Sequence, residues 1–155
     1  MKRATSAAVA TARRAAGCAR SARLQLARED ASAFVEWAVR AEGEARPFLV
    51  QDPGHVEIQR AISEHDRVVI LAPISSGKIS QLAGRIAFEL GRRPWLRCAY
   101  VSNGERQASK AVAAVRSIIA SPEYARLFPG VRLDPREPQT ATSLTRSSSQ
   151  AGIPR

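Results

Sequence analysis

The feature that most constrains the fold is an alternation of short apolar runs and helical patterns between residues 67 and 119. The run Arg67–Leu71 is β-branched and short enough for a buried strand. A turn and a helical stripe follow, and Gly91 is expected to end that helix as a left-handed C-cap. The run Leu96–Val101 predicts a second strand, and Asn103 is expected to cap a second helix. This order predicts an α/β fold with a parallel sheet and flanking helices.

The helical patterns place apolar residues on one face. The first stripe comprises Ile79, Leu82, Ala83, Ile86, Ala87 and Leu90, and the second comprises Ala108, Ala111, Val112, Val115, Ile118 and Ile119. Ser121-Pro122 is expected to end the second helix. Further upstream, Asp30 is a predicted N-cap for a helix that continues to Gly43, and another helix is predicted from near Pro53 to Glu64.

The net charge of +10 is unevenly distributed. Residues 1–28 hold seven basic and no acidic side chains, whereas residues 29–133 hold 14 basic and 12 acidic side chains. Residues 134–155 are rich in Pro, Ser and Thr and have no apolar periodicity. We therefore expect a disordered basic arm, a nearly neutral folded body and a disordered tail. No apolar run approaches the ~20 residues that a membrane span requires.

A loop with the features of a phosphate site joins the first predicted strand to the first predicted helix. It reads Ala72-Pro-Ile-Ser-Ser-Gly-Lys-Ile-Ser80. Gly77 would let the backbone approach a phosphate closely, and Lys78 would reach the outer phosphates of a nucleotide. The alternative is a structural turn with an incidental lysine.

Two positions of this loop depart from the phosphate-loop pattern Gly-x-x-x-x-Gly-Lys-Ser/Thr. Ala72 replaces the first glycine, and Ile79 replaces the hydroxyl residue that holds magnesium. Ser80 is no simple substitute, because one helical step rotates its side chain by about 100°. We therefore predict no confident metal ligand in this loop.

A wider set of segments matches a known family. In chain order they are Ala33-Phe34, His55 with Gln59, Leu71–Lys78, Gln81–Arg85, Glu89–Gly91, Arg97–Ser102, Ser117–Tyr124 and Leu127–Gly130. With these segments the chain resembles the N-terminal ATPase region of a phage terminase large subunit, the motor that packages DNA. The resemblance covers roughly residues 34–133 and implies an incomplete P-loop NTPase-type domain over residues 29–133.

The resemblance also implies site residues, a cofactor and partners. The implied phosphate-binding residues are Pro73, Ile74, Ser75, Ser76, Gly77, Lys78, Ile79 and Ser80. Lys78 would be catalytic only if a downstream carboxylate completed the site, and Gln59 would read the adenine edge. The implied cofactor is ATP, with Mg²⁺ placed in doubt by Ile79. The implied partners are double-stranded DNA, the small terminase subunit and the portal, in the cytoplasm of a bacterial host.

Other residues receive structural interpretations. His55 is read as a helix-start residue, and an exposed helical position is the commoner alternative for Gln59. Arg85 and Arg106 are interpreted as solvated helix-face charges. The two tryptophans, Trp37 and Trp95, are interpreted as packing residues.

The carboxylate pair that such a motor needs is not found downstream. The acids after Leu133 are Asp134 and Glu137, and no apolar run precedes either of them. We therefore expect a truncated, frameshifted or split ATPase that binds nucleotide at most weakly and does not hydrolyse it appreciably by itself. Two alternatives are a nucleic-acid-binding protein that uses the arm 1–28 without nucleotide function, and a non-functional relic of a disrupted terminase gene.

Overall fold

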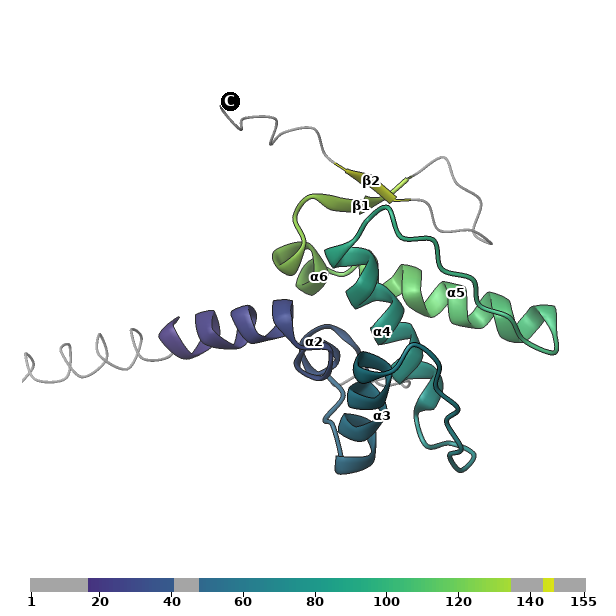
Figure 1. Cartoon of the computed structure of the whole chain (residues 1–155). Helices are drawn as coiled ribbons and strands as arrows, with labels where there is room; N and C mark the ends of the chain where they lie inside the picture. The colour runs from purple at the N-terminus through teal and green to yellow at the C-terminus, as the bar shows by residue number, and fades with distance from the viewer. Residues whose placement is uncertain (1–16, 41–47, 135–143, 147–155) are drawn as a thin grey trace, which may run out of the picture.

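A computed structural model describes residues 17–40 and 48–134, and the backbone of residues 144–146. This part of the chain is mostly helical (Figure 1). Residues 17–29 are helical and precede the other elements. The further elements are α2 (Ala31–Ala38), α3 (Pro53–Glu64), α4 (Lys78–Arg92), α5 (Glu105–Ile119), α6 (Pro122–Leu127), β1 (Val131–Leu133) and β2 (Leu144–Arg146).

The two predicted helices before the loop begin where the sequence places them. The side chains of Asp30 and Asp52 each accept a hydrogen bond from a backbone N–H three residues later, at 2.7 and 2.8 Å. These bonds satisfy N–H groups that have no partner within the helix. The prediction for α3, from near Pro53 to Glu64, is therefore confirmed. Helix α2 is shorter than predicted, because Val39 is extended and ends it well before Gly43.

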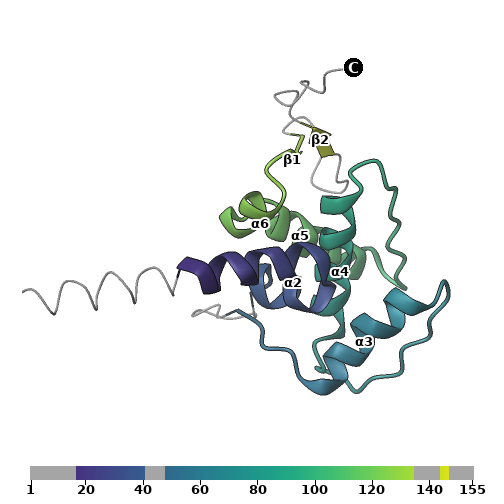
Figure 2. The ribbon, with the colours of Figure 1, turned by 60° about the vertical axis from the view of Figure 1, so that its left-hand side comes forward.

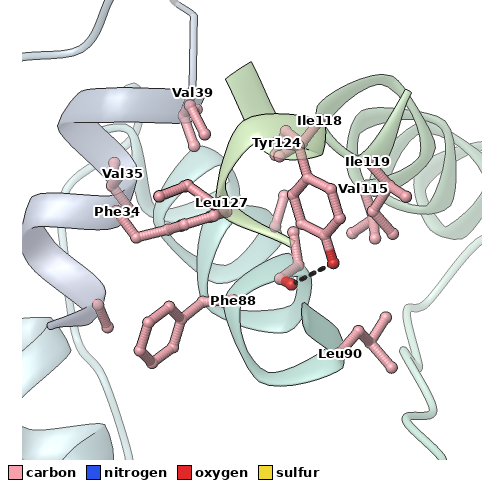
Figure 3. Packing of buried hydrophobic residues seen from close by; sticks show 14 of the residues in the cluster. Phe34, Val35, Val39, Phe88, Leu90, Val115, Ile118, Ile119, Tyr124 and Leu127 are labelled. Atoms are coloured by element: carbon pink, nitrogen blue, oxygen red, sulfur yellow. Dashed lines mark hydrogen bonds between the residues drawn. The ribbon is translucent and has the colours of Figure 1, made fainter. Parts of the chain in front are cut away.

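Helix α4 occupies the centre of the fold, and α2, α3 and α5 pack against it (Figures 1 and 2). The core between α2, α4 and α6 is aromatic, with ring centroids of Phe34, Phe88, Tyr124 and Phe128 5.2–6.2 Å apart in four pairs. The phenol of Tyr124 donates to the carbonyl of Ala87 at 3.1 Å (Figure 3). Burial raises the pKa of the Tyr124 phenol far above its ordinary value, which keeps it a neutral donor.

The predicted helix ends are partly corrected. Gly91 lies inside α4 and is not a left-handed cap. A Cβ atom at this position would lie 2.3 Å from Cδ2 of Phe128, so the glycine is required by close packing. The N-cap of α5 is Gly104 and not Asn103. Ser121 ends the α5 region as predicted and also caps α6, which the sequence did not predict.

The predicted parallel sheet is not formed by the described residues. Neither Arg67–Leu71 nor Leu96–Val101 is assigned as a strand, although both runs are non-helical. The strands that do form are β1 and β2, which pair antiparallel from Val131 with Arg146 to Leu133 with Leu144. A strand requires a neighbour to satisfy its backbone, whereas a helix satisfies its backbone internally. The two apolar runs lack that neighbour within the described part of the chain.

The predicted arm and tail are also corrected where they are described. Residues 17–28 are helical, and Ala27 is 1% exposed in the core. Arg28 donates through Nε to the carbonyl of Leu127 at 3.1 Å and through Nη2 to that of Arg126 at 3.2 Å. In the predicted tail, β2 pairs with β1. The predictions of disorder for residues 1–16, 135–143 and 147–155 lie outside the described residues.

Candidate phosphate-binding site

The predicted phosphate loop has an unusual backbone at two positions. Gly77 is the N-cap of α4 with φ 73° and ψ 4°, and Ser75 has φ 64°. A left-handed conformation suits glycine and is strained for serine. Left-handed residues in a turn belong to the backbone conformations that form anion-binding concavities. The loop therefore places such a turn directly at a helix N-terminus, where N–H groups lack carbonyl partners and the helix dipole favours anions.

Lys78 is the first residue of α4, and its ammonium group folds back onto the loop. Its Nζ donates to the carbonyl oxygens of Pro73 at 2.7 Å and Ala72 at 3.3 Å. Both partners are neutral carbonyls, and an ammonium group binds an anionic oxygen more strongly than a neutral one. The lysine is consequently positioned beside the loop with partners that a phosphate could replace.

His55 holds the loop from the neighbouring helix α3. Its Nε2 donates to the carbonyl of Ser76 at 2.8 Å, and its Nδ1 lies 3.3 Å from Oδ2 of Asp52. Because a carbonyl can only accept a hydrogen bond, Nε2 must carry a proton. A Cβ at Gly77 would lie 3.3 Å from the same Nε2, so the glycine also makes room for this contact. The sequence interpretation of His55 as a helix-start residue holds, but it missed the contact with Ser76, which lies 21 positions away in the chain.

Gln59 lies between α3 and α4 and is 2% exposed, so the interpretation as an exposed helical residue is wrong. Its Nε2 donates to the backbone carbonyl of Gln81 at 3.1 Å and to Oε1 of the same residue at 3.0 Å. Gln51 also donates to Oε1 of Gln81, at 3.2 Å. These bonds connect α3 to the second turn of α4. The Oε1 atom of Gln59 is buried without a hydrogen-bond partner in the described part of the chain.

The remaining loop residues differ in how they meet solvent. Ile74 is 93% exposed, and Pro73 and Ser75 are exposed beside it. The hydroxyl of Ser76 is buried and has no hydrogen-bond partner among the described residues. Most side chains of the turn therefore point into solvent, and the turn stays accessible to a ligand.

The loop does not fit a magnesium ion at the position that the pattern assigns to it. Ile79 is 47% exposed and supplies no oxygen, and Ser80 lies one helical step away. Within the described residues there is no group of three or more His, Cys, Asp or Glu side chains that could hold a metal.

The structure tests the sequence interpretations of three further residues, Arg85, Trp37 and Trp95. Arg85 is not a solvated charge, because its side chain is 14% exposed, pairs with Glu89 at 2.8 Å and donates to Oγ of Ser63 at 2.7 Å. Trp37 packs against the core as predicted, and its Nε1 donates to a backbone carbonyl of α6 at 3.3 Å. Trp95 is 74% exposed, so its prediction as a packing residue is wrong.

Comparison of the chain with protein-family models, curated proteins and solved structures finds no match. In the ranges that the structure describes, no helix has both the length and the apolar character needed to cross a membrane.

Proposed function

We propose that residues Pro73–Ser80 bind the phosphates of a nucleotide, ATP, in a terminase-like ATPase fragment of phage or prophage origin. The observation that supports this most directly is the left-handed Gly77 at the N-terminus of the 15-residue helix α4, followed at once by Lys78. The choice of the terminase family rests on the sequence motifs that resemble the terminase large subunit. In this proposal the apolar runs 67–71 and 96–101 are strands of an α/β domain that further strands complete.

The chemistry of binding follows from the loop. The first turn of α4 supplies backbone N–H donors and the positive end of a helix dipole, and both favour an anion. Lys78 exchanges its two carbonyl partners for phosphate oxygens. His55 holds the carbonyl of Ser76, so this carbonyl is kept in a hydrogen bond and away from the bound anion.

The same residues favour binding without hydrolysis. Phosphoryl transfer relies on a metal held by a loop hydroxyl and on a carboxylate that helps to organise metal and water. Ile79 supplies no hydroxyl, and the acids after Leu133 follow no apolar run. The isolated chain therefore binds ATP without rapid turnover.

A calorimetric titration of the full chain with ATP tests this proposal. We expect Lys78→Ala to weaken binding by roughly tenfold or more, because it removes a charge-assisted contact. Lys110→Ala is the matched control, since Lys110 is exposed on α5 and its loss changes the net charge equally. Equal affinity of the two variants would contradict the proposal, as would hydrolysis at motor rates that Lys78→Ala abolishes.

A second candidate function is nucleic-acid binding by the basic N-terminal region. A groove of about 620 Å³ beside helix 17–29 is lined by three arginines, two glutamates and two aromatic residues, which are Arg20, Arg23, Arg126, Glu36, Glu123, Trp37 and Phe48. Arginines that track a phosphate backbone and rings on which bases stack are the two components of single-strand binding.

Deletion of residues 1–28 is unsuitable as a test, because it would remove Ala27 and Arg28 from the folded body. The test is deletion of residues 1–16 combined with Arg20→Gln and Arg23→Gln. Six arm charges remain available once Arg28 is engaged, which predicts a log–log salt slope of about −5. Fluorescence anisotropy of a labelled oligonucleotide over a salt series should show this slope, and the combined variant should lose it. An unchanged slope would exclude the arm.

A further inference from the structure

The run 96–101 forms neither helix nor strand and crosses from α4 to α5 as a long open segment (Figure 1). Among the described residues, no backbone hydrogen bond joins the N–H and C=O groups from Arg97 to Val101 to another backbone group. Val101 is 90% exposed, although the composition of the run is that of a buried strand. An exposed extended segment with free N–H and C=O groups is a template for the addition of a further strand.

A groove lies beside this run and has an apolar lining. It has a volume of about 460 Å³ and is lined by Ile86 and Leu90 of α4, Val112 and Val115 of α5, and the run Leu96–Tyr100; it is called the α4–α5 groove below. Arg97 is the one charged residue among the residues that line it. The groove therefore combines an apolar floor, an unpaired backbone edge and one positive charge.

The run Arg67–Leu71, which precedes the phosphate loop in the chain, is a second apolar run without a described backbone partner. Its exposure alternates, with Val68 and Ile70 half-buried and Val69 and Leu71 88% and 93% exposed. This period of two is that of a strand with one face against the protein. The chain thus carries two extended apolar runs whose described backbone is not paired.

We propose that the α4–α5 groove binds an extended apolar segment of a different polypeptide, with an acidic residue that pairs with Arg97. The extended form follows from the unpaired edge, since an added strand pairs with a row of backbone N–H and C=O groups along its length. The apolar character follows from the floor of the groove. The acid follows from Arg97 and from its exposed basic neighbour Arg92, whereas Arg93 is already paired with Glu89.

Charge argues against a second copy of this chain as the occupant. Each copy has a net charge of +10, and each would bring an arginine to the same groove. Like charges at an interface cost affinity and slow association. A partner strand that ends in carboxylates meets the same groove with the opposite sign. This inference agrees with the proposed function, in which further strands complete the run 96–101, but it does not require nucleotide binding at the loop.

Protection of a thiol by a designed peptide tests the proposal. The protein is the full chain with Cys18→Ser, so that the exposed Cys98, which lines the groove, is the single thiol. The probe is an eight-residue peptide of alternating Val and Thr with Glu at both ends. Burial raises the pKa of the Cys98 thiol, so all alkylation rates are compared at one pH. Saturating peptide should slow alkylation of Cys98 about tenfold and slow hydrogen exchange over residues 96–101.

Two matched peptides and one variant separate the contributions. A peptide with alternate backbone amides N-methylated keeps its side chains but cannot pair, so it should give no protection. A peptide with Lys in place of Glu should bind about tenfold more weakly, because it meets Arg97 with a like charge. Arg97→Gln should reduce the difference between the Glu and Lys peptides.

Three results would overturn the proposal. One is equal protection by the N-methylated peptide, which would mean that the groove takes apolar ligands without strand pairing. Another is no protection by the Glu peptide at any concentration. The third is a dimer in sedimentation equilibrium whose Cys98 is protected without peptide, which would make a second copy the occupant.

Discussion

Apolar side chains are buried in the helical core, whereas similar side chains in the runs 67–71 and 96–101 are largely exposed. In the core, Phe34 and Val35 are 0% exposed and are enclosed by α2, α4 and α6. In the run 67–71, Val69 and Leu71 are almost fully exposed. Hydropathy alone would assign both regions to the interior. The difference lies in the backbone, since each helix closes its own hydrogen bonds and only its side chains need a partner.

An extended run needs a partner for its side chains and another for its backbone. Helices α4 and α5 line a groove beside the run 96–101, Val68 and Ile70 of the run 67–71 are half-buried, and neither run has an adjacent strand among the described residues. The core is therefore complete by itself, whereas the runs are complete only with added strands. The chain therefore combines a buried helical core with two unpaired runs, and the following variants test each of these two regions.

The largest effect should come from truncating a core aromatic. We expect Phe34→Ala to destabilise the fold by about 3–5 kcal/mol, because it removes buried surface and leaves a cavity among three other rings. Leu71→Ala on the extended run should change the free energy of unfolding by less than about 0.5 kcal/mol. Urea denaturation measures both. Equal losses in the two variants would mean that the run is buried in solution and that the contrast is wrong.

A smaller effect should come from adding one methyl group where α4 meets Phe128. Gly91→Ala places a Cβ 2.3 Å from that ring, and overpacking of this kind costs about 1–3 kcal/mol. Gly130→Ala is the matched control, since its Cβ would have no atom within 4 Å. Thermal unfolding should separate the two variants. If both unfold like the parent chain, the close approach of α4 and Phe128 is not rigid.

The smallest of the three effects should come from the polar contact beside the loop. Gln59→Ala removes a buried donor to Gln81 and should cost about 1–2 kcal/mol. Gln107→Ala, an exposed change on α5, should cost much less. Denaturation gives the free energy of unfolding of the two variants, and titration with ATP gives their affinity for the nucleotide. A loss of affinity that exceeds the small effect expected of a merely structural contact would support the reading of Gln59 as a base contact.

The sequence predicted α2, α3, α4 and α5 because their signals are local, but it missed α6 and the helix over residues 17–29. Asp30 and Asp52 cap α2 and α3 through bonds that span three residues. On α5, the predicted apolar face from Ala111 to Ile119 packs against the protein core, as the helical period of 3.6 residues requires. The sequence predicted the strands poorly. A β-branched run indicates that a segment can pair as a strand, but it carries no information on whether a neighbouring strand is present.

The site was predicted in part for the same reason. Gly77 and Lys78 stand at the start of α4 as expected, since a turn before a helix is a local pattern. The contact of His55 with Ser76 and that of Gln59 with Gln81 join residues 21 and 22 positions apart. Such contacts depend on how α3 lies against α4, which no local pattern encodes.

By itself the sequence determined where α2 and α3 begin, which face of α5 is apolar, and that a glycine and a lysine stand at the start of α4. Only the tertiary structure decided that Arg28 docks the N-terminal helix onto α6, and that Gly91 serves packing. The tertiary structure also decided that the runs 67–71 and 96–101 have no adjacent strand among the described residues. The physical reason is range: caps and helical periodicity act within a few residues, whereas burial and strand pairing depend on partners that the chain must bring together in space.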